Sequence, residues 1–280
     1  MFDKVDQVKH LPISFGDIAR YVIVPGDPNR VPIISELLDD VQHQGQKREF
    51  NAARGKYKGV DVSVVSTGIG CPSTAIAVEE LSHIGAEVFI RIGTSGSVDG
   101  SAQKGDIFIA TAAVRDDGTS KQYIPIEFPA LADIEVVDSL IKASEALNIP
   151  TKIGVCQSKD SFFGEVEPER MPVAEYLDTK WKAWQRGGVG ASEMEAATLF
   201  TLSSIFGLHS GGIFAVETHD KETIHKITKI VLESIYYMET LRMRYSTKLS
   251  YGGNNTSVKN TTLFYSIQIP IDFTRLFGPW

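Results

Sequence analysis

The sequence predicts an α/β fold: a single domain with a central mixed, largely parallel β-sheet flanked by helices. Short apolar runs of strand length alternate along the chain with longer segments of helical periodicity. Glycine-rich turns follow several of the apolar runs. Such alternation covers a sheet with helices, and ligands then gather beyond the carboxyl ends of the strands.

The predicted elements follow from these patterns in chain order. Strands are predicted over residues 21–24, 62–66, 88–92, 107–110, 153–157 and 212–216. Helices are predicted over residues 31–38, 73–84, 134–147, 173–184, 192–206 and 221–243. Several of these helices begin near Pro, Ser or Asp, which suit the first helical positions.

The periodic pattern ends near residue 240. We therefore expect one domain over residues 1–240 and a divergent tail over residues 241–280. The tail begins with a polar stretch rich in Gly, Asn, Ser and Thr and continues into a short apolar segment without an amphipathic face. Its pattern assigns it no role.

Composition excludes several classes of function. A net charge of −7 argues against non-specific nucleic-acid binding, which needs clustered Lys and Arg. No apolar run approaches the roughly 18 residues of a membrane span, and no signal peptide is evident, so we expect a cytoplasmic protein without a membrane partner. Cys71 and Cys156 are far apart and outside any CxxC motif, which predicts neither a disulfide nor a metal site.

Two glycine-rich turns follow predicted strands. VPGDPNR, residues 24–30, follows a predicted strand, so bare N–H groups near Gly26 could meet an anion that Arg30 also reaches, although PGDP is also simply a good turn. STGIGCPS, residues 66–73, is a second strand-to-helix turn in which Ser73 could cap the helix. It lacks the third glycine and the acidic residue of a dinucleotide site, so a dehydrogenase is disfavoured.

Charged residues in apolar settings mark a second set of candidates. Arg91 stands inside the strand of FIRIGTSG, where an unpaired guanidinium is costly, so either an internal acid or an anionic ligand should meet it. Arg48 in KREF adds another cation, in a pattern typical of a solvated face. Read alone, residues 192–195 (SEME) are a helix N-cap followed by acids in the first turn.

Together these segments resemble the nucleoside phosphorylase-I family, and most closely its bacterial uridine phosphorylase branch, over roughly residues 8–216. YIPIEFPA (123–130), EPERMPV (167–173) and ASEMEAATLF (191–200) extend the match. The resemblance implies a pentosyltransferase that uses phosphate to cleave uridine into uracil and ribose 1-phosphate, in nucleoside salvage. It implies phosphate as a co-substrate, no metal or organic cofactor, and a dimer or hexamer with shared active sites.

The resemblance also assigns roles to individual residues. The phosphate-binding residues would be Gly26, Arg30, Arg48, Arg91 and Thr94, with Arg48 supplied by a neighbouring subunit. The ribose-binding residues would be His10, Thr94, Glu193, Met194 and Glu195, with His10 crossing the dimer. The base-binding residues would be Phe162, Glu165 and Arg170, and the catalytic residues Arg30, Arg91, Thr94 and Glu195.

Base choice is where the match departs from the uridine branch. Glu165 occupies the position of a glutamine, and a carboxylate only accepts hydrogen bonds, so it should stabilise a uracil anion less well and suit the two N–H donors of guanine. Residues 217–220 lack a pocket arginine and a lid-like segment, and Asp220 could replace the acid of purine enzymes only in a remodelled turn. A purine or broad-specificity phosphorylase and a catalytically impaired nucleoside-binding or phosphate-binding protein therefore remain alternatives.

Overall fold

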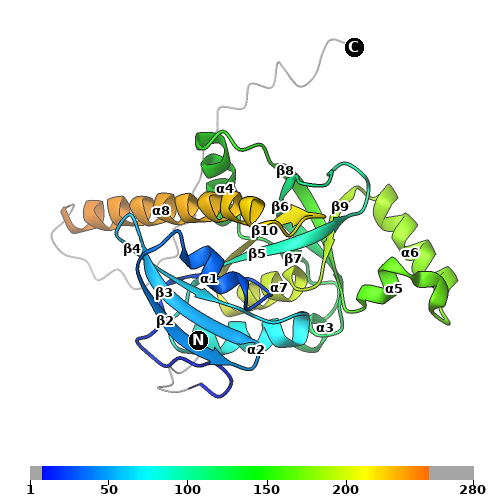
Figure 1. The fold of residues 1–280 in the computed structure, drawn as a ribbon, viewed down its shortest axis with the longest axis horizontal. Helices are drawn as coiled ribbons and strands as arrows, with labels where there is room; N and C mark the ends of the chain where they lie inside the picture. The colour runs from blue at the N-terminus through cyan, green and yellow to red at the C-terminus, as the bar shows by residue number, and fades with distance from the viewer. Residues whose placement is uncertain (1–7, 252–280) are drawn as a thin grey trace, which may run out of the picture. The chain divides into compact units, whose positions relative to one another are not determined.

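The computed structural model describes residues 8–251, and the chain divides into two compact units, Met1–Arg242 and Met243–Trp280 (Figure 1). Of the expected C-terminal tail, residues 252–280 lie outside the described residues. None of the helices within residues 8–251 is both long enough and apolar enough to cross a membrane.

The elements alternate as the sequence predicts. The strands are β1 (Tyr21–Ile23), β2 (Asp39–Lys47), β3 (Phe50–Tyr57), β4 (Val60–Val65), β5 (Val88–Ser97), β6 (Ile107–Asp116), β7 (Ala130–Leu131), β8 (Lys152–Lys159), β9 (Val189–Glu193) and β10 (His209–Val216). The helices are α1 (Arg30–Ser35), α2 (Cys71–His83), α3 (Ser120–Tyr123), α4 (Ile134–Ala146), α5 (Phe162–Val166), the short 3₁₀ helix η1 (Pro168–Arg170), α6 (Ala174–Arg186), α7 (Ala196–Phe206) and α8 (Lys221–Tyr251).

Strand β5 is the junction of a ten-stranded mixed sheet. It pairs with β1 and β10 in parallel and, at its carboxyl end, with β9 in the antiparallel direction. Because β10 also pairs with β6, and β8 joins β6 to β9, these five strands close on themselves. Strands β1, β4, β3 and β2 extend from β5 as an open sheet. The carboxyl end of β5 therefore lies where the closed and open parts of the sheet meet.

Period-two alternation divides the core into two layers. On β1, Val22 packs into the cluster that α2 and α7 cover, whereas Tyr21 and Ile23 pack into the cluster that α1, α4 and α8 cover. Figure 1 shows α8 along one side of the sheet and α2 and α7 on the other. The predicted α/β architecture with a mixed sheet is confirmed, and antiparallel pairs such as β2–β3 and β3–β4 stand beside the parallel ones.

Two predicted helix starts are wrong. The helix predicted from residue 192 begins at Ala196, because Ser192 and Glu193 still pair with β5 and β8 as the end of β9. Ser73 does not cap α2, which begins after Gly70, and its Oγ donates to Glu49 at 2.7 Å. In both places tertiary pairing overrides a local capping pattern.

The hairpin of β2 and β3 is not among the elements predicted from the sequence. β2 is mostly exposed, and its polar sequence DDVQHQGQK has no apolar alternation to reveal it. The hairpin turn contains Arg48 at a φ of 55°, so the KREF motif is a tight turn between two strands rather than one solvated face.

Helix α8 should contribute strongly to the stability of the first unit. Ile227 of α8 is fully buried, so Ile227→Ala should lower the free energy of unfolding by about 2–5 kcal/mol through lost burial and a cavity. Lys229→Ala, at an exposed position two residues further along, should change it by no more than about 0.5 kcal/mol. Guanidinium unfolding of the two variants checks this, and equal stability would show that α8 does not pack as described.

Candidate functional site

Arg91 lies buried at the centre of the site, on β5. Its Nε donates to Oε2 of Glu193 at 2.9 Å, and its Nη2 donates to Oε2 of Glu195. Burial alone would lower the pKa of Arg91, but the charges of Glu195 and Glu193 outweigh it and raise that pKa. The sequence predicts either an internal acid or an anionic ligand beside Arg91, and the structure contains internal acids at this position.

The two carboxylates are themselves held by backbone groups. Glu193 ends β9 and accepts from the N–H groups of Glu195 at 2.9 Å and Ala196 at 3.0 Å, at the start of α7. Glu195 accepts from the N–H of Gly70 at 2.5 Å, which ties α7 to the turn before α2. Burial raises the pKa of Glu195, while Arg91 opposes that rise. The three charged groups thus join β5, β9, α7 and the second glycine-rich turn.

One edge of the Arg91 guanidinium is left open. Its Nη1 is buried and has no hydrogen-bond partner among the described residues. A Cβ on Gly26 would stand 3.7 Å from that Nη1 and 3.2 Å from the carbonyl oxygen of Gly68, so glycine keeps the approach clear. A buried guanidinium N–H without a partner is costly and rare. The arrangement suits an anion such as phosphate, which has several oxygens that can accept hydrogen bonds from Nη1.

Arg30 adds a second cation to this region. It begins α1, after the PGDP turn, and burial lowers its pKa, as does the positive charge of Arg91. Its Nη2 lies 3.4 Å from Nδ1 of His219. Two guanidiniums close enough to disfavour each other's charge are stabilised by an anion between them. The structure therefore brings together Gly26, Arg30 and Arg91 as the sequence motifs predict.

Thr94 and Met194 lie close to this cluster along the chain. Thr94 is half-buried on β5, three residues after Arg91 and opposite Ala215 of β10. Met194 lies between the two acids, and its carbonyl oxygen accepts from Sγ of Cys71 at 3.2 Å. Burial raises the pKa of the Cys71 thiol, which keeps it protonated and unreactive.

Among the predicted base-binding residues, Glu165 and Phe162 lie on α5. Oε2 of Glu165 lies 2.8 Å from Nζ of Lys159 and 2.6 Å from Oγ of Ser192. Phe162 is half exposed and packs edge-on against Phe163, with ring centroids 5.5 Å apart. Arg170 is exposed on η1 and pairs with Glu167, so the described contacts do not join it to Glu165.

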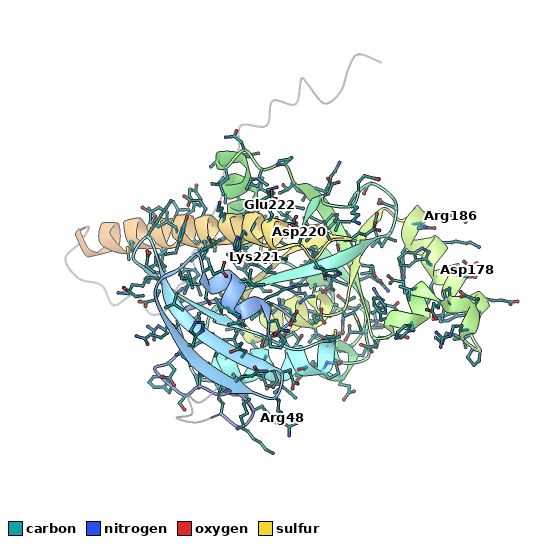
Figure 2. The ribbon with its side chains drawn as sticks, viewed as in Figure 1. Arg48, Asp178, Arg186, Asp220, Lys221 and Glu222 are labelled. Carbon is teal, nitrogen blue, oxygen red and sulfur yellow. The ribbon has the colours of Figure 1, made fainter. Side chains whose placement is uncertain are left out.

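Two of the predicted phosphate- and ribose-binding residues lie outside the Arg91 cluster. The exposed Arg48 stands at the turn between β2 and β3, at the lower edge of Figure 2, and its described contacts do not include Arg30 or Arg91. Nδ1 of His10 lies 2.6 Å from Oε1 of Glu80 on α2. Neither residue contacts Arg30 or Arg91 of its own chain among the described contacts, so the predicted roles of Arg48 and His10 depend on a second chain.

The short segment after β10 leads directly into α8. Asp220, labelled with Lys221 and Glu222 in Figure 2, accepts from the N–H of Thr223 at 2.8 Å and from the hydroxyl of Thr218 at 2.5 Å. These hydrogen bonds lower the pKa of Asp220 to about 2. Asp220 therefore caps α8, and this turn is not remodelled to present it to a base.

Sequence reasoning missed Lys159, Ser192 and Ser158. Ser192 had been assigned to a helix cap, and Ser158 donates to Oε1 of Glu193. Lys159 is a buried cation at the end of β8. The predicted strand stops at residue 157. A strand extended to residue 159 would have marked Lys159, like Arg91, as a cation within a buried strand.

The chain is similar in sequence to known phosphorylases. A family model described as the phosphorylase superfamily matches residues 20–235. The chain is 48% identical to a uridine phosphorylase of Thermococcus kodakarensis, over 74% of this chain and 76% of the relative. It is 38% identical to the uridine phosphorylase of Escherichia coli (81% and 96%) and 40% identical to a guanosine phosphorylase of Halorubrum lacusprofundi (74% and 82%). By its sequence match and its α/β fold, this chain belongs to the phosphorylase superfamily.

Proposed function

We propose that the protein cleaves nucleosides with inorganic phosphate, and that uridine is its main substrate, giving uracil and ribose 1-phosphate. The observation that carries the proposal is the buried Nη1 of Arg91, which has no hydrogen-bond partner within residues 8–251, opens toward Gly26 and has Arg30 nearby. A phosphate oxygen at Nη1 would satisfy this group and leave the ion pairs to Glu193 and Glu195 intact. The buried network is thus already suited to receiving an anion.

In this proposal the phosphate is held by Gly26, Arg30, Arg91 and Thr94, and the ribose by Thr94, Glu193, Met194 and Glu195. Positioned in this way, a phosphate oxygen attacks C1′ from the face opposite the base. The C1′–N bond breaks, its electron pair leaves with the base, and the sugar 1-phosphate forms with inversion. Phe162, Glu165 and Arg170 would contact the departing base. Nothing is oxidised or reduced, so phosphate is the co-substrate and no organic cofactor is needed.

Two observations bear on the base. Uridine phosphorylases are among the relatives, at 48% and 38% identity, which supports uridine. A guanosine phosphorylase at 40% identity and the carboxylate of Glu165 favour guanosine as the second candidate.

We also propose a dimer, alone or within a hexamer, that shares its sites across subunits. Arg48 and His10 would then complete the partner's phosphate and ribose sites. The 78% exposed Ile69, beside the glycine whose N–H binds Glu195, supports contact with another chain at this edge. We place the enzyme in the cytoplasm, a reducing compartment that suits its free Cys71 and Cys156.

An assay of the purified protein with uridine, inosine and guanosine, each with and without phosphate, tests the proposal. We expect phosphate-dependent release of uracil to be fastest. Faster guanosine cleavage would favour the second candidate. Nucleoside binding without cleavage of any of the three would instead indicate an impaired enzyme and overturn the proposal.

Gly26→Ala should raise the KM for phosphate about tenfold, or about 1.4 kcal/mol of binding, because the added methyl group enters the approach to Nη1 of Arg91. Steady-state kinetics at saturating uridine measure the change. Gly187→Ala is a matched control, because its Cβ would also stand 3.2 Å from a carbonyl oxygen but at the end of α6. An equal effect of both changes would argue against a phosphate site beside Gly26.

The Arg48→Ala variant and the Arg30→Ala variant should each have little phosphorolysis activity when expressed alone. Co-expression of the two variants should restore activity. A mixed dimer has one site with Arg30 from one chain and Arg48 from the other. Random pairing should therefore restore about a quarter of wild-type turnover. If Arg48 served its own chain, every site in the mixture would lack one arginine and no recovery would occur.

A further inference from the structure

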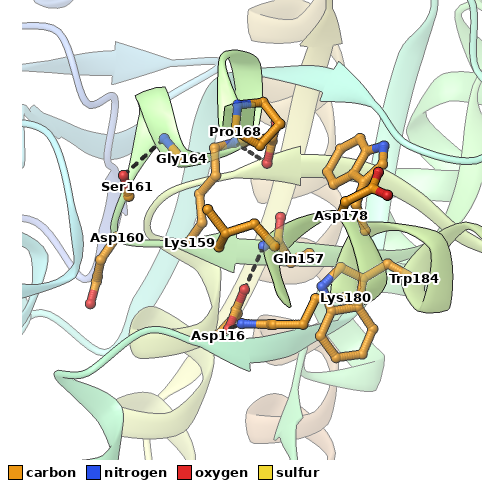
Figure 3. A pocket seen from close by; sticks show the side chains of 13 residues that line it. Asp116, Gln157, Lys159, Asp160, Ser161, Gly164, Pro168, Asp178, Lys180 and Trp184 are labelled. Atoms are coloured by element: carbon orange, nitrogen blue, oxygen red, sulfur yellow. Dashed lines mark hydrogen bonds and ion pairs between the residues drawn. The ribbon is translucent and has the colours of Figure 1, made fainter. Parts of the chain in front are cut away.

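A compact polar cluster lies where β8, β9 and α5 meet, beside the pocket of Figure 3, in which Lys159 and Gln157 are labelled. Its members are Lys159, Glu165 and Ser192, here called the Lys159 cluster. Nζ of Lys159 lies 2.8 Å from Oε2 of Glu165 and 2.7 Å from Oγ of Ser192. The side chains of Lys159 and Glu165 are only 9% and 13% exposed. An ion pair this buried is costly to break, so it holds both groups in fixed positions.

The cluster is connected on both sides. Oγ of Ser192 lies 2.6 Å from Oε1 of Gln157, and Nε2 of Gln157 donates to Asp116 at 2.9 Å. Lys159, Gln157 and Glu165 line one cavity of about 220 Å³. On the other side, Ser192 directly precedes Glu193, the acid that pairs with Arg91. The cluster therefore adjoins the proposed ribose site without being part of it.

The two oxygens of Glu165 have different surroundings. Both contacts within the cluster go to Oε2. Oε1 has no hydrogen-bond partner among the described residues and lies 3.7 Å from where a Cβ on Gly96 would stand. Gly96 is two residues after Thr94 on β5 and lies opposite Ser192 of β9. The one free acceptor of Glu165 therefore faces the strand end that carries the proposed phosphate and ribose contacts.

This geometry changes what Glu165 can recognise. A carboxylate with two free oxygens suits guanine, whose N1–H and 2-amino group are adjacent donors. A carboxylate with one free oxygen suits uracil, which presents the single donor N3–H between two carbonyl groups. The ammonium group of Lys159 also offsets the carboxylate charge, which would otherwise repel the negative charge that collects on the departing base.

We propose that Lys159 sets the base preference as a positioning residue: it occupies one oxygen of Glu165 and leaves a single acceptor for a pyrimidine N–H. The proposal rests on the proposed phosphorolysis and deepens it. Lys159 acts through Glu165 and need not touch the base. The same pairing explains how a glutamate can stand where a neutral amide is expected in a uridine-cleaving enzyme.

The test measures kcat/KM for uridine and for guanosine on the same protein preparation, so that their ratio is independent of the folded fraction. Lys159→Met removes the cation beside Oε2 of Glu165 and leaves only the Ser192 hydroxyl there. That hydroxyl can donate to Oε1 of Gln157 instead, so the second oxygen of Glu165 becomes available to a ligand. We expect the uridine value to fall tenfold or more and the guanosine-to-uridine ratio to rise about tenfold or more, within the range that one polar contact can discriminate. Lys180→Met is the matched control, because it removes a lysine that lines the same cavity but pairs with Asp116, and it should leave the ratio unchanged.

The double variant Lys159→Met with Glu165→Gln removes both charges of the pair. Its amide offers one acceptor oxygen, so uridine preference should return to within a few-fold of wild type. This variant also decides the question if Lys159→Met alone does not fold. An unchanged ratio in Lys159→Met, or a double variant that prefers guanosine, would overturn the role of Lys159. Wild-type protein that cleaves no nucleoside would instead overturn the proposed function, so the two failures are distinguishable.

Discussion

The ion pairs of one buried arginine with two buried carboxylates organise the site. Arg91 belongs to β5, Glu193 to the end of β9 and Glu195 to the start of α7. Three buried charges are tolerated only because each is paired and hydrogen-bonded. Their contacts fix the connection between β9 and α7. They also hold the turn at Gly70 against this connection. The position of every proposed substrate contact near β5 depends on this network.

The closed part of the sheet gives the network its rigidity. β5 pairs with β10 along its length and with β9 at its carboxyl end, so Arg91 lies opposite Gly212 within a continuous ladder. The glycine at position 26 then leaves the Nη1 end of the guanidinium uncovered by the described residues. A rigid cation with one open end can select an anion by position as well as by charge. The same architecture thus supplies stability and a prepared binding group.

Pairing of opposite charges also stabilises the part of the site proposed to bind the base. Glu165 would be an unfavourable neighbour for a base that leaves with negative charge, and its pairing with Lys159 reduces that cost. Glu193, at the end of β9, accepts from the hydroxyl of Ser158 on β8, and Glu165, on α5, accepts from the hydroxyl of Ser192 on β9. Serine hydroxyls therefore link both acids to the strand ends. The site therefore consists of paired charges. In each pair one group keeps a polar atom for a ligand: Nη1 of Arg91 in one pair and Oε1 of Glu165 in the other.

The sequence by itself determined the α/β class, the strand before each glycine-rich turn and the candidates Gly26, Arg30 and Arg91, because strand periodicity, turn glycines and a cation in an apolar run are local signals. Glu195 became a candidate only through the resemblance to the phosphorylase family. The sequence did not reveal β2, whose exposed residues lack alternation, or β9, whose last two residues begin the SEME pattern that imitates a helix cap. Only the tertiary structure decided that Lys159 pairs with Glu165 and that Arg91 pairs with Glu193 and Glu195. Those partners come from contacts between separate elements, and no local pattern encodes which buried charge will face which.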